Sequence, residues 1–189
     1  MTFQLRTGEM MTRRNIRDRL SREAFAAYLR QMRDLLGLQN TEIIERMRET
    51  ASKITTVHPK DMWELMSGQR MPRGPIMTAL TDVLNLDVHH IERATRYGSE
   101  VVGTLTENSV IDLDEMVIQA RSLGHELAQQ RVKDRTIQQA LDHIAEGVPP
   151  EQVQQALAIL DELYQQSPER AKQYLALGTF FIQQDKKTS

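Results

Sequence analysis

Apolar residues recur at intervals of three and four along most of this chain, as they do on one face of an α-helix. The clearest series is Phe25, Leu29, Met32 and Leu36, which keeps one side apolar over several turns. In the first half of the chain the pattern predicts five helices, at residues 21–37, 40–47, 59–67, 75–84 and 87–97. Because the helical spacing dominates, we predict an all-α fold.

The second half repeats this spacing in four further stretches, so a four-helix region is predicted there. Before it, Gly98, Ser99, Gly103 and a polar run interrupt the periodicity, as a linker does. The N-terminal residues carry several arginines and few apolar groups. The predicted organisation is a basic arm over residues 1–20, a helical domain over 21–97, a linker over 98–110 and a helical domain over 111–184.

Charge is unevenly distributed between the two halves. The whole chain has a net charge of −2, but residues 1–98 carry 16 Lys and Arg against 12 Asp and Glu, whereas residues 99–189 carry 8 against 14. Positive charge is densest in residues 1–33, which hold 8 arginines and 3 acids. A basic surface on an otherwise acidic protein favours contact with a polyanion at that surface.

Two features missing from the sequence restrict chemistry and location. No residue is a cysteine, which excludes disulfides and thiolate metal sites. No apolar run approaches the roughly 20 residues that a membrane-spanning helix needs, and the N-terminus lacks the apolar core of a signal peptide. We therefore expect a cytoplasmic protein.

The stretch over residues 58–85 organises the first half of the chain. Pro59 suits the first position of a helix, and Gly68 suits its end. At 100° per residue the core side of this helix holds Met62, Leu65 and Met66, and the opposite side holds Lys60, Glu64 and Ser67. A cationic turn at residues 69–74 and a second apolar helix follow, so one helix is predicted to be free to touch a partner.

The run MxxLxSGxRxP beginning at Met62, followed by an apolar helix and Asn-Leu-Asp, resembles the Cro/CI-type (XRE-like) helix-turn-helix family of transcription regulators. The likeness covers roughly residues 21–96. It implies a DNA-binding domain of about five helices in which residues 59–67 form the recognition helix of the major groove. The sequence departs from the family just before that helix, where residues 48–57 form an extended turn.

Two kinds of DNA contact are expected at this surface. Lys60 and Glu64, one turn apart on the exposed side of the recognition helix, are predicted to bind base edges, with Asp61 as a further candidate. Phosphate contacts, which fix the register of the protein on DNA, are expected from Gln69, Arg70 and Arg73 of the turn and from Arg13, Arg14 and Arg17 of the arm.

Five more residues are candidates, most of them with a structural alternative. Ser67 lies on the exposed side of the recognition helix, and His58 could cap that helix or contact a phosphate. Gln39 lies where the family often places a phosphate contact, and Thr56 could bind a phosphate or close a turn. Trp63, the only tryptophan, is predicted either to cover the three-helix core or to reach the sugar-phosphate backbone.

The four C-terminal helices are predicted to join two copies of the chain. A small helix-turn-helix unit gains specificity by binding two half-sites, and this requires a dimer. An effector-binding domain and a platform for another protein are the alternatives. The expected partners are therefore double-stranded DNA, a second copy of the chain and a protein effector.

The sequence lacks common catalytic motifs. It has no glycine-rich phosphate loop, no GxSxG and no HExxH, and its five histidines form no metal-type pair. We therefore expect neither an enzyme nor a cofactor or metal site. The alternative to a DNA-binding regulator is a helical protein–protein interaction module, which Asp61 and Glu64 favour because acids repel phosphates.

Overall fold

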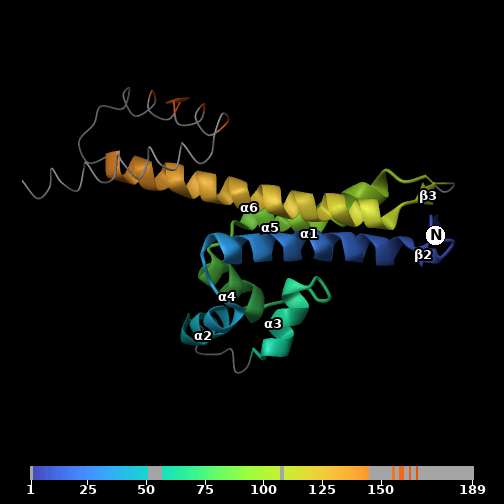
Figure 1. Ribbon diagram of the computed structural model, residues 1–189, viewed down its shortest axis with the longest axis horizontal. Helices are drawn as coiled ribbons and strands as arrows, with labels where there is room; N and C mark the ends of the chain where they lie inside the picture. The colour runs from blue at the N-terminus through green and yellow to red at the C-terminus, as the bar shows by residue number, and fades with distance from the viewer. Residues whose placement is uncertain are drawn as a thin grey trace, which may run out of the picture. The chain divides into compact units, whose positions relative to one another are not determined.

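The computed structural model describes residues 2–50, 57–106 and 109–144, together with single positions at 155, 158, 159, 162 and 165. In this part of the chain six helices and three short strands confirm the prediction of a mostly helical fold (Figure 1). The chain divides into two compact units, Met1–Arg131 and Val132–Ser189. The candidate site lies in the first unit.

Helix α1 (Arg13–Leu35) is the centre of the first unit. Its start is fixed by Thr12, whose Oγ1 accepts a hydrogen bond at 3.2 Å from the backbone N–H three residues on. Ile16 and Leu20 are fully buried and continue the apolar stripe toward the N-terminus. The helix therefore begins before the predicted position 21, and the prediction of a basic arm over residues 1–20 was wrong.

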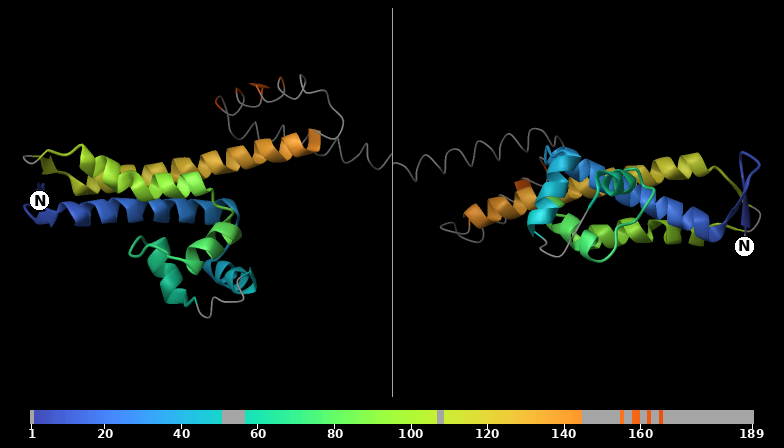
Figure 2. Two further views of the ribbon diagram at one scale, coloured as in Figure 1. Left: turned by 180° about the vertical axis from the view of Figure 1, so that it is seen from behind. Right: turned by 90° about the horizontal axis from the view of Figure 1, so that it is seen from below.

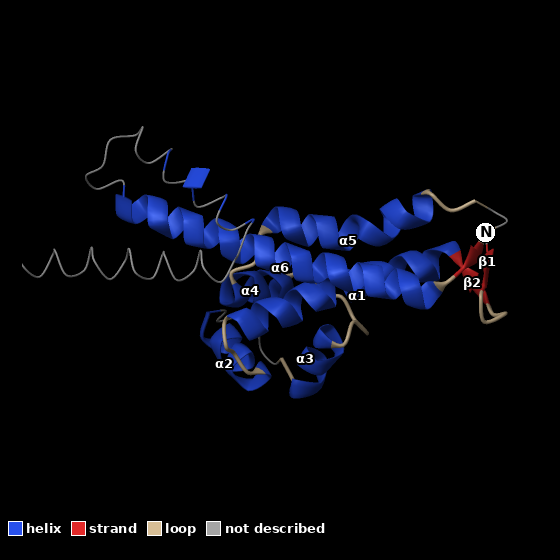
Figure 3. Ribbon diagram, turned by 45° about the horizontal axis from the view of Figure 1, so that its top comes forward, coloured by secondary structure: helices blue, strands red, loops and turns tan. Residues whose placement is uncertain are grey.

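A β-hairpin precedes α1. β1 (Thr2–Leu5) pairs antiparallel with β2 (Met10–Thr12) and parallel with β3 (Val110–Ile111), so the strand order is β2-β1-β3. Phe3 and Leu5 of β1 are buried. Figure 3 shows the hairpin at the N-terminal end of α1. The sheet was not predicted, because its strands of two to four residues are too short to show an alternating pattern.

Helix α5 (Val88–Gly103) runs along α1, and α6 (Leu113–Ile144) begins after β3. Figure 2 shows α1, α5 and the first part of α6 side by side. α6 is one helix of 32 residues where the sequence predicted two, because residues 128–136 contain good helix formers and no breaker. Apart from single positions between 155 and 165, the last two predicted helices lie outside the described residues. Although α6 is long, no helix in the described part of the chain is apolar enough over sufficient length to cross a membrane.

Two glycines allow helices to approach α1 closely. A Cβ atom on Gly98 of α5 would lie 2.0 Å from the carbonyl oxygen of Arg17, and one on Gly124 of α6 would lie 2.3 Å from that of Ala24. Gly98 is therefore a packing residue inside a helix, not a breaker. The predicted linker over residues 98–110 was wrong, because its first part belongs to α5 and its last residue to β3.

Helices α2 (Asn40–Thr50), α3 (Pro59–Met66) and α4 (Pro75–Leu84) form a second group beside α1 (Figure 1). These bounds confirm the predicted helices at 59–67 and 75–84. α2 contacts α3 and α4, and α1 contacts both of these helices. The buried side chains of the group include Ile43, Met47, Met62, Leu65 and Leu80.

Candidate nucleic-acid interface

The first turn of α3 is held by His58 and Asp61. The backbone N–H of His58, the residue before the helix, donates to Oδ2 of Asp61 at 3.2 Å, as in a capping box. Oδ1 of the same carboxylate accepts a hydrogen bond from Nη1 of Arg70 at 3.0 Å. Asp61 thus stabilises both the start of α3 and the turn that follows the helix, a structural role beside the predicted contact with a base.

The outward face of α3 carries Lys60, Trp63 and Glu64. The Lys60 side chain is 83% exposed, and its Nζ lies 3.9 Å from Oε1 of Glu64 one turn later. The Glu64 side chain, which was predicted to lie on the exposed side, is only 24% exposed. Trp63 is 55% exposed, so the prediction that it covers the core was wrong; Leu65 and two methionines fill the buried side instead. Ser67, which ends the helix, donates its hydroxyl to the Glu64 carbonyl oxygen at 3.2 Å.

The connection between α3 and α4 is fixed by a glycine and by α1. Gly68 has a φ of +74°, in the left-handed region that favours glycine. The N–H groups of Gln69 and Arg70 then donate to a carbonyl oxygen in the last turn of α3, at 2.9 and 3.3 Å. Nη1 of Arg30 in α1 donates to the carbonyl oxygen of Met66. The end of α3 is therefore tied to α1.

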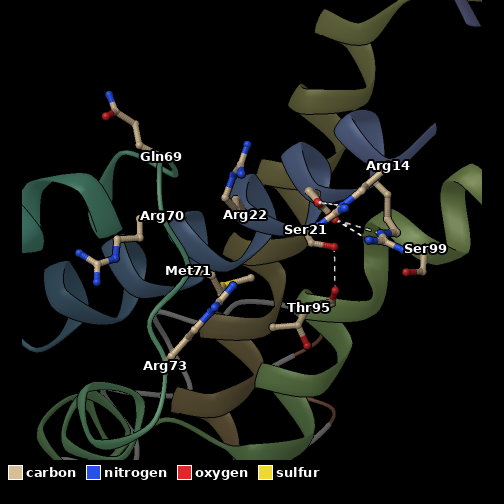
Figure 4. Close-up of a pocket in the computed structure, with 11 residues that line it drawn as sticks. Arg14, Ser21, Arg22, Gln69, Arg70, Met71, Arg73, Thr95 and Ser99 are labelled. Carbon is tan, nitrogen blue, oxygen red and sulfur yellow. Dashed lines mark hydrogen bonds and ion pairs between the residues drawn. The ribbon is translucent and has the colours of Figure 1, made fainter. Parts of the chain in front are cut away.

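A pocket of about 650 Å³ opens between α1, the α3–α4 connection and α5 (Figure 4). It is termed the basic pocket, because its lining includes Arg14, Arg17 and Arg22 of α1 and Arg70 and Arg73 of the connection, with Gln69 beside them. Five of the six predicted phosphate contacts are thus brought together from two segments that are far apart in the sequence.

Asp18 is the acid among the described lining residues of the basic pocket. Its Oδ1 accepts a hydrogen bond from Nε of Arg17 at 3.0 Å and lies 2.9 Å from Nη2 of the same arginine, and its Oδ2 lies 3.6 Å from Nε of Arg14. The three side chains are between 39% and 82% exposed, so the ion pairs are weak. One carboxylate shared by two guanidinium groups leaves the pocket positively charged.

Six lining residues were not predicted: Asp18, Ser21, Arg22, Met71, Thr95 and Ser99. Ser21, the predicted start of a helix, lies inside α1, where its Oγ donates to the Thr95 carbonyl oxygen at 2.7 Å and accepts from the Gly98 N–H at 3.2 Å. Nε of Arg22 is buried and has no hydrogen-bond partner among the described residues. Even on a helix drawn from residue 13, Arg22 lies well round the helix from Arg17, so periodicity alone would not have grouped Arg22 with the predicted phosphate contacts.

Arg13 and Gln39, both candidates for phosphate contacts, do not line the basic pocket. Nη2 of Arg13 donates to the carbonyl oxygen of Val102 near the end of α5, at 3.2 Å. Gln39 is exposed just before α2, and its backbone N–H donates to Oε2 of Glu42 at 2.6 Å. Thr56 lies outside the described residues. The contacts predicted for Arg13 and Gln39 therefore lie apart from the five predicted residues that line the basic pocket.

Comparison with known proteins assigns nothing to this surface. No known protein family, no curated protein and no solved structure matches the chain. In the part of the chain that the structure describes, no group of three or more His, Asp or Glu side chains could hold a metal ion. The functional argument therefore rests on the outward face of α3 and on the basic pocket.

Proposed function

We propose that the chain is a double-stranded DNA-binding transcription regulator of the Cro/CI type, acting in the cytoplasm at the nucleoid. The observation that carries this proposal is that the exposed face of α3 leads directly into a connection and a pocket lined with arginines. An exposed polar helix flanked by guanidinium groups suits the major groove, where base edges lie between two rows of phosphates.

The order of the helices supports the same proposal. A Cro/CI-type domain implies about five helices with the recognition helix third, and here α3 follows α2 and precedes α4 and α5. α2 contacts α3 and α4, while α5 packs on α1. This packing leaves Lys60 and Trp63 of α3 exposed and Glu64 partly exposed. The extended turn that precedes α3 falls mainly on residues 51–56, outside the described part of the chain.

Lys60 and Glu64 are proposed to bind base edges. Lysine donates to O6 and N7 of guanine, and glutamate accepts from N4 of cytosine. Their ion pair is long, at 3.9 Å, and its lysine is 83% exposed, so Lys60 is easily released from Glu64 when DNA binds. Trp63, exposed beside them, is proposed to lie against the sugar-phosphate backbone. The ion pair with Arg70 offsets the negative charge of Asp61, so Asp61 repels phosphates less strongly.

Arg14, Arg17 and Arg73 are proposed to bind phosphates. Each neutralised phosphate releases counterions, so such contacts raise affinity for all sequences and make binding dependent on salt. Arg14 and Arg17 must exchange their contacts with Asp18 for phosphate oxygens, whereas Arg73 is exposed on the connection.

We propose further that two copies of the chain bind two half-sites, joined through their C-terminal helices. The second compact unit, Val132–Ser189, is the segment available for this role. The mass of the full chain in solution tests the proposal. A dimer is expected at micromolar concentration, and a monomer over the whole accessible concentration range would contradict it.

Fluorescence-polarisation titration of genomic duplexes at two salt concentrations tests DNA binding. Lys60→Ala is expected to cost roughly 1–3 kcal/mol on the preferred duplex and little on a random one. Arg73→Ala should weaken both and lower the salt slope by about one. Arg93→Ala, which removes an exposed arginine of α5 outside the basic pocket, should change neither.

Two outcomes would contradict this proposal. If the wild-type chain ignores duplex DNA at low ionic strength, the helical interaction module becomes the function to pursue. If Lys60→Ala weakens preferred and random duplexes equally, Lys60 contacts phosphate and α3 does not dock as proposed.

A further inference from the structure

We infer that the basic pocket binds a small ligand that carries two or more linked phosphates. The pocket is a concave space of about 650 Å³, within the range of small-molecule sites. Most such sites are lined mainly by apolar side chains, whereas this lining is rich in arginine. A compact polyanion is the ligand class that matches both the shape and the charge.

The guanidinium groups are arranged on two sides of this space. Arg17 and Arg22 come from α1, and Figure 4 shows Arg73 extending from the connection toward α1. Arg70 is turned away from the pocket (Figure 4), toward Asp61 of α3. Each guanidinium presents a planar set of donors that fits two phosphate oxygens. Three such groups on opposite sides can bind adjacent phosphates better than one isolated phosphate.

Arg22 provides a second, independent observation at this pocket. Its Nε is buried and has no hydrogen-bond partner among the described residues. Buried donors in proteins nearly always find an acceptor, so such a group calls for an explanation. A phosphate in the pocket could draw the Arg22 side chain inward and supply acceptor oxygens to its N–H groups.

Asp18 competes with such a ligand in the free protein. Its carboxylate occupies the same Arg17 nitrogens that a phosphate would use: it accepts a hydrogen bond from Nε at 3.0 Å and lies 2.9 Å from Nη2. A ligand must displace this carboxylate or tolerate its negative charge. Removing the charge should therefore strengthen binding, which a variant that merely damages the fold would not do.

The same arginines are proposed to contact DNA, so the ligand and DNA should compete. Competition rests on the proposed function, because it requires that DNA binds. Binding of the small ligand does not rest on it, and the two can be measured separately on the same protein.

Isothermal titration calorimetry of the full chain, without DNA and at constant ionic strength, tests the inference with pyrophosphate, orthophosphate and ADP. Pyrophosphate is expected to bind at one site per chain, and orthophosphate at least about tenfold more weakly. Tighter binding of ADP than of pyrophosphate would identify a nucleotide ligand, and equal binding would identify the diphosphate group alone. Both results support the site.

Variants locate the binding. Arg22→Gln should raise the Kd for pyrophosphate at least about tenfold, as expected for lost charge-assisted hydrogen bonds. Arg73→Gln, on the exposed connection, should do the same without endangering the fold. Asp18→Asn should lower the Kd several-fold. Arg93→Gln removes a positive charge of α5 outside the pocket and should leave the Kd unchanged.

The inference is overturned if pyrophosphate does not bind the wild-type chain, or if orthophosphate binds equally well. It is also overturned if a folded Arg73→Gln chain binds normally, or if Arg93→Gln weakens binding as much as Arg22→Gln does. Duplex titrations on the same preparations separate the two proposals. DNA binding without pyrophosphate binding refutes only this inference, and the reverse result refutes only the proposed function.

Discussion

Arg131 of α6 makes two hydrogen bonds to Asn85, the residue that ends α4. Its Nε donates to the backbone carbonyl oxygen and its Nη2 to the side-chain Oδ1, both at 2.9 Å. Asn85 has a φ of +50°, a left-handed conformation typical of the end of a helix. One arginine therefore ties α6 to the turn between α4 and α5.

Arg131→Ala is expected to lower the free energy of unfolding by about 1–3 kcal/mol, because two part-buried acceptors on Asn85 lose their donors. Arg93→Ala removes an exposed arginine and should change stability by less than about 0.5 kcal/mol. Urea denaturation followed by circular dichroism measures both. Equal midpoints for the two variants would show that the contact does not support the fold.

Gly98→Ala is expected to destabilise the protein by about 1–3 kcal/mol or more, because its Cβ would lie 2.0 Å from the carbonyl oxygen of Arg17. Backbone atoms at this contact cannot move aside without separating α1 from α5. Gly103→Ala, in the same helix, has no described atom within 4 Å of its Cβ. It should be neutral or gain up to about 1 kcal/mol of helix propensity. Thermal unfolding of both variants tests this, and matching losses would contradict the packing role of Gly98.

The helices that the sequence predicted best have clear signals at their starts. α3 and α4 each begin with a proline, Pro59 and Pro75, at a position where the missing N–H costs no hydrogen bond. Each is also short and has a single apolar stripe along one side. Local chemistry was sufficient here, so both helices were predicted to within one residue.

The features that the sequence did not predict depend on tertiary contacts. Gly98 has the same local signal whether it breaks a helix or packs against one, and only the neighbouring α1 decides. Ser21 resembles a helix cap, but its hydroxyl bonds across to α5. The sequence predicted most of the arginines of the basic pocket, but the pocket itself forms only where the α3–α4 connection lies against α1. Arg22 was missed because its place in the lining depends on that tertiary contact.

Trp63→Ala is expected to change the free energy of unfolding by less than about 0.5 kcal/mol, because this side chain is 55% exposed. Leu65→Ala, two residues later on the buried side of α3, should cost about 2–5 kcal/mol. Urea denaturation gives both values. The same Trp63→Ala protein should bind duplex DNA more weakly. A large stability loss at Trp63 would show that it packs in the core.

Asp87 is expected to make stability depend on pH in the acid range. Burial raises the pKa of Asp87, but hydrogen bonds from the backbone N–H groups of His89 and His90 and the positive charges of His90 and Arg131 outweigh this, so the pKa lies below its ordinary value. The unfolded chain therefore takes up this proton first as pH falls. The stabilisation by the carboxylate is present at neutral pH and is lost below roughly pH 4.

Two variants of Asp87 separate its charge from its hydrogen bonds. Asp87→Asn keeps an acceptor at the start of α5 and loses the charge, so it should be less stable than the wild type at pH 7 and approach it as pH falls below roughly 4. Asp87→Ala also loses the acceptor, which costs about 1 kcal/mol at any pH, and should remain less stable throughout. Urea midpoints between pH 7 and pH 3 measure this. If the deficit of Asp87→Asn is the same at both ends of that range, the ionised carboxylate is not preferentially stabilised in the folded chain.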